Sequence, residues 1–111
     1  MDIPVEVAER FSEGTLVAAI AQDVTNGEVL MMAWMNEDAL QQTLATGNVT
    51  YWSRSRNQLW TKGEGSGHTQ NLISASYDCD GDALLLQVEQ TGAACHTGER
   101  SCFFREIEVT E

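Results

Sequence analysis

The chain has few basic residues and no long apolar run, and each of these shortages excludes a class of protein. Its 111 residues include six basic ones, of which Lys62 is the single lysine, against 17 acidic ones, and the formal net charge is −11. This balance excludes a general nucleic-acid or anionic-membrane binder, because phosphate backbones need a basic surface. The longest apolar run, VLMMAWM, ends at Met35 and is far shorter than the ~20 residues that span a bilayer.

The chain also lacks a recognisable export signal. Its first residues, MDIPVEVAERF, are acidic and do not show the basic-then-apolar pattern of a signal peptide. We therefore expect a cytoplasmic protein that does not associate with membranes. A length of 111 residues and a hydrophobic share of 42% suit one folded domain over residues 1–111.

Residue patterning predicts a mostly β fold, a β-rich α+β protein of small antiparallel sheets with one or two short helices. Asn36 is a good N-cap, and Gly47 a good C-terminal stop, for a helix on EDALQQTLAT. Asn26-Gly27 marks a hairpin turn, and a second helix is expected over residues 5–11. Strands are expected wherever β-forming residues run between Gly or polar turns, namely at 15–23, 28–35, 49–55, 59–63, 70–78, 83–90 and 102–109.

The three cysteines, Cys79, Cys95 and Cys102, favour a metal site over a disulfide. Their number is odd, and a reducing cytosol disfavours disulfides. They also lack the close CxxC pairs of structural zinc fingers, which need four ligands. Three thiolates and one open position are the arrangement of a catalytic zinc, because the open position holds a water. Inert packing of buried thiols is the alternative.

A group of aspartates surrounds the first cysteine in the sequence DCDGDA. In an extended chain the side chains alternate, so Asp78, Asp80 and Asp82 would share one face and Cys79 would point to the other. Three carboxylates that lie close together suit Mg²⁺ or Ca²⁺. An EF-hand loop is rejected, because Ala83 stands where glycine is needed and a strand follows. An acidic surface turn without an ion remains the alternative.

Two histidines are candidates for proton transfer. His68 in SGHTQ and His96 in ACHTG are the only histidines of the chain, and both lie in polar stretches that contain glycine. Histidine titrates near neutral pH, which suits a general acid or base. A surface or packing role is the alternative for each of them.

Half of the basic residues lie in a single stretch, SRSRNQLWTKGEGSGH. Arg54, Arg56 and Lys62 are phosphate-binding candidates, since guanidinium and ammonium groups match phosphate oxygens. The glycines that follow Lys62 can expose backbone N–H groups to an anion, although the pattern is not a P-loop. A basic edge strand with a flexible loop is the alternative.

The combined motifs YWSRSRNQLWTKGEGSGHTQ, YDCDGDALLLQVEQTG and ACHTGERSCFF resemble the phosphoribosyl-AMP cyclohydrolases of histidine biosynthesis, and the resemblance runs from about Leu16 to Phe104. It implies a zinc- and magnesium-dependent hydrolase that acts on a cyclic amidine. In this reaction water attacks C6 of the N1-substituted adenine and opens the ring at the N1–C6 bond.

The resemblance also implies a homodimer with metal sites at the subunit boundary. Cys79 of one chain would join Cys95 and Cys102 of the other around zinc, and the three aspartates would hold Mg²⁺. His96 would move the proton, with His68 as second choice or substrate contact. Arg54, Arg56 and Lys62 would offset the substrate phosphates.

Two other classes of function remain open from the residues alone. A small β protein could use its metal structurally and bind a nucleotide without turnover, in which case removing zinc should unfold it. A redox thiol protein fits less well, because no attacking and resolving thiols lie at short spacing.

Overall fold

A computed structural model describes residues 2–110, which form one mixed sheet and two helices. The helices are α1 (Val5–Ser12) and α2 (Glu37–Thr46). The strands are β1 (Val17–Asp23), β2 (Val29–Met35), β3 (Thr50–Ser53), β4 (Gln58–Thr61), β5 (Gln70–Tyr77) and β6 (Ala83–Gln90). The predicted mostly β class is confirmed.

The six strands form a single sheet in the order β4-β3-β2-β1-β6-β5. Neighbouring strands are antiparallel except β1 and β6, which run parallel with Ala18 opposite Ala83 and Asp23 opposite Val88. The expectation of several small antiparallel sheets is therefore wrong in this respect. A parallel pair is possible because the long connection from β1 to β6 carries the rest of the fold.

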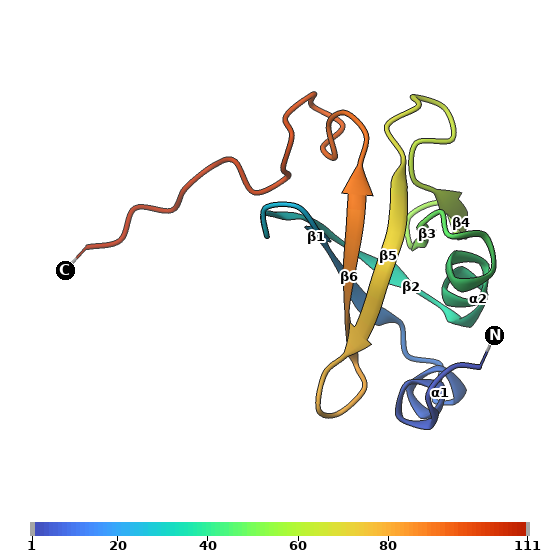
Figure 1. Ribbon diagram of the computed structural model, residues 1–111. Helices are drawn as coiled ribbons and strands as arrows, with labels where there is room; N and C mark the ends of the chain where they lie inside the picture. Colours follow the sequence, from blue (N-terminus) through green and yellow to red (C-terminus); the bar gives the residue numbers. More distant parts are fainter. Residues whose placement is uncertain (1, 111) are drawn as a thin grey trace.

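The core lies on the face of the sheet that the helices cover. Buried and half-buried residues alternate along β1, and Val17, Ala19 and Ala21 turn inward. Tyr51 is fully buried and donates a hydrogen bond to Gln70 Oε1 at 2.6 Å, which satisfies its hydroxyl inside the core. Figure 1 shows α2 beside β3 and β4, and α1 near the turn of the β5–β6 hairpin.

Local sequence signals explain how α2 begins and ends. The side chain of Asn36 accepts a hydrogen bond from Ala39 N at 2.9 Å, and Gly47 ends the helix with a left-handed φ of 79°. The predicted Asn26-Gly27 turn is also present, with Gly27 at φ 78° between β1 and β2. Both helices and the first six predicted strands are confirmed, with shifts of a few residues at their ends.

The last predicted strand, residues 102–109, is absent: this segment has no regular secondary structure and extends away from the body of the protein (Figure 1). A strand needs a neighbouring strand to pair with its backbone groups. In the described part of this chain, no strand pairs with these residues.

Candidate functional site

Two of the three cysteines lie together in the loop that follows β6. The backbone N–H of Cys102 donates to Leu30 O at 2.7 Å, and Ser101 Oγ donates to Val29 O at 2.8 Å. These two bonds hold the end of the loop against β2. Cys95 is buried a few residues earlier, so the loop holds a pair of neighbouring thiols in a fixed place.

An ion-pair cluster holds the same loop to the β1–β2 hairpin. Arg100 contacts the carboxylate of Asp23, and its Nε donates to Glu28 Oε1 at 2.8 Å. Asp23 is buried, and its other oxygen accepts from Thr25 N at 2.8 Å. Sequence reasoning missed these residues, because Asp23 and Arg100 are far apart in the chain and neither lies in a recognisable motif.

The surroundings of the two thiols act on them in opposite directions. Hydrogen bonds from the side chain and backbone of Thr97 lower the pKa of Cys95, and the Thr97 hydroxyl lies 3.0 Å from Cys95 Sγ. Burial raises the pKa of Cys102, and its hydrogen bond to Cys95 raises it further. The Cys95 thiol therefore loses its proton more readily, and the thiolate is the form that binds metal ions. The Cys102 thiol needs a nearby cation to stabilise its thiolate.

Lys62 supplies positive charge beside these thiols. It is buried, and its Nζ donates to Ala94 O at 2.5 Å, next to Cys95 in the loop. Burial lowers the pKa of Lys62, whereas the neighbouring Cys102 and Cys95 raise it. The Lys62 ammonium therefore contacts the backbone of the loop that carries Cys95 and Cys102, here called the thiol loop, and it is not exposed to solvent.

The structure does not bring the three predicted phosphate-binding residues together. Arg54 and Arg56 lie in the turn between β3 and β4, at the opposite end of β4 from Lys62, and both are exposed. The guanidinium of Arg54 lies 4.9 Å from the centre of the Trp34 ring. Whether these residues contact phosphate stays a prediction.

A cavity of ≈ 370 Å³ lies beside the thiol loop and contains both predicted catalytic histidines. His68 comes from the loop between β4 and β5, while His96 follows Cys95 directly. The lining residues are Trp60, Lys62, Gly63, Glu64, Gly65, Ser66, His68, Ala93, Cys95, His96 and Gly98. The two candidate acid–base histidines, the Cys95 thiol and the Lys62 ammonium therefore line the same cavity.

Two glycines determine where His68 lies. A Cβ added to Gly92 would come within 2.5 Å of the His68 ring, and one added to Gly63 within 2.5 Å of the His68 backbone. Both glycines have a positive φ, 70° for Gly92 and 82° for Gly63. At least part of the glycine-rich pattern is therefore explained by the close packing of His68.

The aspartates lie at the other end of the β5–β6 hairpin. The ligand oxygens of Asp78, Asp80 and Asp82 are all within 4.8 Å of one another, and all three residues are exposed. Within residues 2–110 this is the one group of three or more acidic, histidine or cysteine side chains close enough together to hold a metal ion. The predicted cluster of carboxylates is present.

The backbone that builds the cluster is not the extended one expected. Residues 78–82 form a turn, in which Gly81 has φ 74° and Asp78 Oδ1 accepts from Asp82 N at 3.0 Å. The hairpin must reverse direction here, so strict alternation of side chains does not apply. The turn itself gathers the carboxylates.

The carboxylates disturb one another's ionisation. The pKa of Asp82 is raised to about 6 by shared hydrogen bonds with Asp80 and Asp78 and by their negative charges. Partial desolvation acts to raise the pKa of Asp78, but hydrogen bonds from the Asp82 side chain and from backbone N–H groups outweigh it and lower that pKa. A divalent cation would relieve the repulsion, so the donor set fits a hard metal ion.

Cys79 lies in the same exposed turn, far from the other two thiols of its own chain. The eight residues of β6 separate this turn from the loop that carries Cys95 and Cys102, which corresponds to about 26 Å along the strand. One chain therefore presents a thiol pair at one end of the hairpin and a single thiol at the other.

Residues 31–104 match the family described as phosphoribosyl-AMP cyclohydrolase. The phosphoribosyl-AMP cyclohydrolase of Hyphomonas neptunium is 63% identical over 103 residues, covering 93% of this chain and 79% of that protein. The one from Acidiphilium cryptum is 59% identical over 107 residues, covering 96% and 92%. The histidine biosynthesis bifunctional protein HisIE of Prochlorococcus marinus is 60% identical over 100 residues, covering 89% of this chain and 44% of its own length. No helix in the described part of the chain is long and apolar enough to cross a membrane.

Proposed function

Because this chain belongs to the phosphoribosyl-AMP cyclohydrolase family, we propose that it hydrolyses phosphoribosyl-AMP at C6 of the N1-substituted adenine ring. Water adds to C6, the N1–C6 bond breaks, and the product is the phosphoribosyl-formimino-aminoimidazole carboxamide ribotide. The reaction is a hydrolysis of a cyclic amidine in histidine biosynthesis. The observation that carries the proposal is the cavity in which His68 and His96 lie beside Cys95.

The thiols of Cys79, Cys95 and Cys102 would hold zinc, the first from one copy and the other two from a second. Zinc held by three protein ligands supplies an acidified water as the nucleophile near neutral pH. Its fit rests on the adjacent thiols of Cys95 and Cys102, the lowered pKa of Cys95 and the charge of Lys62. Thiols that bind metal must stay reduced, which suits the cytoplasm.

The histidines of the cavity handle the protons of the reaction. The attacking water loses a proton, and N1 must gain one as its bond to C6 breaks. His96 accepts the proton of the water, because it lines the cavity directly beside Cys95. His68, held in place by Gly63 and Gly92, is the second choice for this role or a contact to the substrate.

The charges of the substrate are offset by two parts of the chain. Asp78, Asp80 and Asp82 would hold Mg²⁺, whose positive charge attracts phosphate oxygens. Arg54 and Arg56 are exposed cations in a chain of net charge −11 and can contact a phosphate of the substrate. Lys62, which is buried, would act beside the thiols or on a substrate group that enters the cavity.

The test is an ultraviolet assay of ring opening with phosphoribosyl-AMP, run before and after chelation and after zinc is restored. We expect about one zinc per chain, loss of turnover on chelation, and recovery with zinc. The Cys95→Ser variant should lose both zinc and turnover while keeping its circular dichroism spectrum. Full activity in a preparation free of zinc would overturn the proposal. It would also be overturned if chelation unfolded the protein and the zinc-loaded protein showed no turnover, because the metal would then be structural.

A further inference from the structure

The segment that follows Cys102 exposes large apolar side chains to an unusual degree. In residues 103–110, here called the C-terminal arm, Phe103 is 64% exposed, Ile107 90% and Val109 83%. Figure 1 shows the arm leaving the body of the protein as an extended chain. With Phe104, which is 38% exposed, four large apolar side chains are exposed in one short segment, and such a patch is typical of a surface that another protein surface covers.

The arm has the alternation of a half-buried strand. In an extended chain, alternate residues share a face. One face then carries Phe103, Arg105, Ile107 and Val109, and the other carries Phe104, Glu106 and Glu108. This pattern gave rise to the incorrect prediction of a strand over 102–109. A chain of this pattern becomes a strand when a free sheet edge is offered to it.

An edge of this kind lies at β5, one of the two outer strands of the sheet. β5 ends the strand order, and its outer side is paired only near its start, where the segment 47–49 bonds to Gln70 and Leu72. From Ile73 to Tyr77 that side has no backbone partner among residues 2–110. Ile73 is 50% and Tyr77 43% exposed, so this part of β5 is an unprotected apolar edge of the kind proteins cover.

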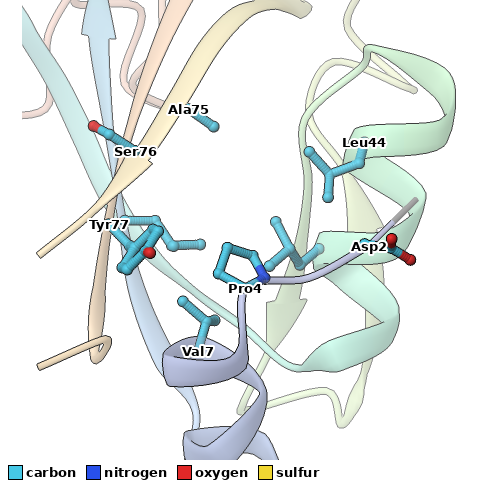
Figure 2. A pocket seen from close by; sticks show the side chains of 9 residues that line it. Asp2, Pro4, Val7, Leu44, Ala75, Ser76 and Tyr77 are labelled. Carbon is cyan, nitrogen blue, oxygen red and sulfur yellow. The ribbon is translucent and has the colours of Figure 1, made fainter.

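A groove borders this edge. It has a volume of ≈ 390 Å³ and runs between β5 and the two helices, as the open space between Ala75, Ser76, Pro4 and Leu44 in Figure 2 shows. Most of its lining is apolar, and it consists of Asp2, Pro4, Val7, Leu40, Leu44, Ala75, Ser76, Tyr77 and Leu84. The acidic groups nearby are Asp2, in the lining, and Glu6, whose carboxylate accepts from the Tyr77 hydroxyl at 3.4 Å.

We propose that the arm of one copy pairs with β5 of a second copy as an added antiparallel strand, an inference that rests on the zinc site shared between copies. If Cys102 of one copy lies beside Cys79 of the other, Phe103 follows Cys102 directly and Tyr77 precedes Cys79 by two residues. The arm then runs along the edge from Tyr77 toward Ile73.

The chemistry of the two surfaces matches in this arrangement. Phe103 and Ile107 enter the apolar groove, and Arg105 between them meets the acidic groups of Asp2 and Glu6. The two glutamates on the opposite face of the arm remain in water. The same contact covers Phe103 and Ile107 of the arm and the open edge of β5, so each copy covers exposed apolar surface of the other.

The first test measures the dimer dissociation constant by sedimentation in the presence of zinc. Ile107→Asp places a charge in the apolar contact and should weaken the dimer by about 100-fold or more, since each tenfold step is ~1.4 kcal/mol. The matched control, Glu106→Gln on the opposite face, should change the constant by less than about threefold. Equal effects of the two variants would overturn the proposal. A loss of thermal stability by Ile107→Asp that does not depend on protein concentration would also overturn it, because the arm would then bind its own chain.

The second test separates this proposal from the zinc site itself. A Cys79→Ser chain mixed with a Cys102→Ser chain can form one intact thiol set, and failure to regain zinc and turnover would reject the shared site. If they are regained, Ile107→Asp is placed on either chain in turn. It should weaken zinc retention more on the Cys79→Ser chain, whose arm leaves the intact site. Equal losses of zinc from the two mixed dimers would reject the arm and leave the shared site standing.

Discussion

The two ends of the β5–β6 hairpin differ in nearly every physical respect. At one end, the turn of residues 78–82 exposes three carboxylates and one thiol, and it is held chiefly by its own backbone bonds to Asp78. At the other end, the loop that carries Cys95 and Cys102 is attached to β1, β2 and Lys62 by an ion pair and several hydrogen bonds.

This difference matches two kinds of metal chemistry. Hard cations such as Mg²⁺ accept flexible, hydrated oxygen ligands, whereas a thiolate zinc needs a small number of ligands at fixed positions. The hairpin keeps the two sites apart within one chain, because the length of β6 lies between them. The proposed zinc site, which uses Cys79, would therefore require a second copy and would make assembly a condition for catalysis.

The largest effect is expected from replacing a thiol at either end of the hairpin. Cys102→Ser and Cys79→Ser should each reduce turnover by about 1,000-fold or more, because loss of a ligand removes the metal that supplies the nucleophile. Zinc content measured by plasma emission should fall in parallel. If Cys79→Ser keeps its zinc and its activity, the exposed end takes no part in the zinc site and the functional link between the two ends is broken.

The next largest effect is expected from a substitution beside the loop that carries Cys95 and Cys102. Gly92→Ala would bring a methyl group within 2.5 Å of the His68 ring, and displacing a catalytic group by ~1 Å can cost about 100-fold in turnover. The substitution should also destabilise the protein, since φ at Gly92 is 70°.

The matched control for this substitution is Gly14→Ala. Gly14 lies outside the cavity and has φ 79° with no atom within 4 Å of an added Cβ, so it tests backbone strain, about 1–2 kcal/mol, without the collision. Turnover and urea unfolding of both variants separate the two causes. Equal activities of the two alanine variants would show that the position of His68 does not matter.

Much of this arrangement could be predicted from local residue patterns. Asn36 and Gly47 mark the ends of α2, and the spacing of Asp78, Asp80 and Asp82 indicates a carboxylate cluster. These features depend on residues close together in the chain, so local rules capture them. The cluster was expected for the wrong reason, because the turn at Gly81 and not an extended strand gathers the carboxylates.

The features that could not be predicted depend on distant contacts. The ion pair of Arg100 with Asp23, and the contact of Lys62 with Ala94, join segments brought together only by the folded sheet. The strand predicted over 102–109 shows the opposite limit: its residues alternate as in a strand, but no strand in the described part of the same chain pairs with them. Strand propensity indicates what a segment can form and does not say in which copy its partner lies.

A smaller effect is expected from replacing Lys62, and it distinguishes a support of the thiol loop from a contact to the substrate. Lys62→Met removes the hydrogen bond to Ala94 O and the charge beside the thiols, so zinc affinity should fall by about tenfold, as for other groups that support metal ligands. Arg56→Met, at the exposed turn, should leave zinc affinity unchanged and raise KM if it contacts phosphate. Competition with a chromogenic chelator measures the first quantity. If Lys62→Met raised KM and left zinc affinity intact, Lys62 would be a substrate contact and not a support of the loop.

The smallest effect is expected in the turn of residues 78–82. It is a change with pH in the free energy of unfolding of the metal-free protein. The folded-state pKa of Asp82 is raised to about 6 by Asp80 and Asp78, above the 3.8 of a free aspartate. Between these two pH values the folded protein binds more protons at this site than the unfolded chain does, so the free energy of unfolding falls as pH rises. Asp82→Asn cannot ionise, and its thermal midpoint should exceed that of the parent at pH 7.5 and match it near pH 4.

Asp78→Asn should act in the opposite sense, because the lowered pKa of Asp78 stabilises the fold at neutral pH. Saturating Mg²⁺ should reverse the order of parent and Asp82→Asn, since the ion binds the parent's carboxylates and stabilises the folded state by mass action. Parallel pH profiles for parent and Asp82→Asn, with and without Mg²⁺, would show that the three carboxylates do not interact.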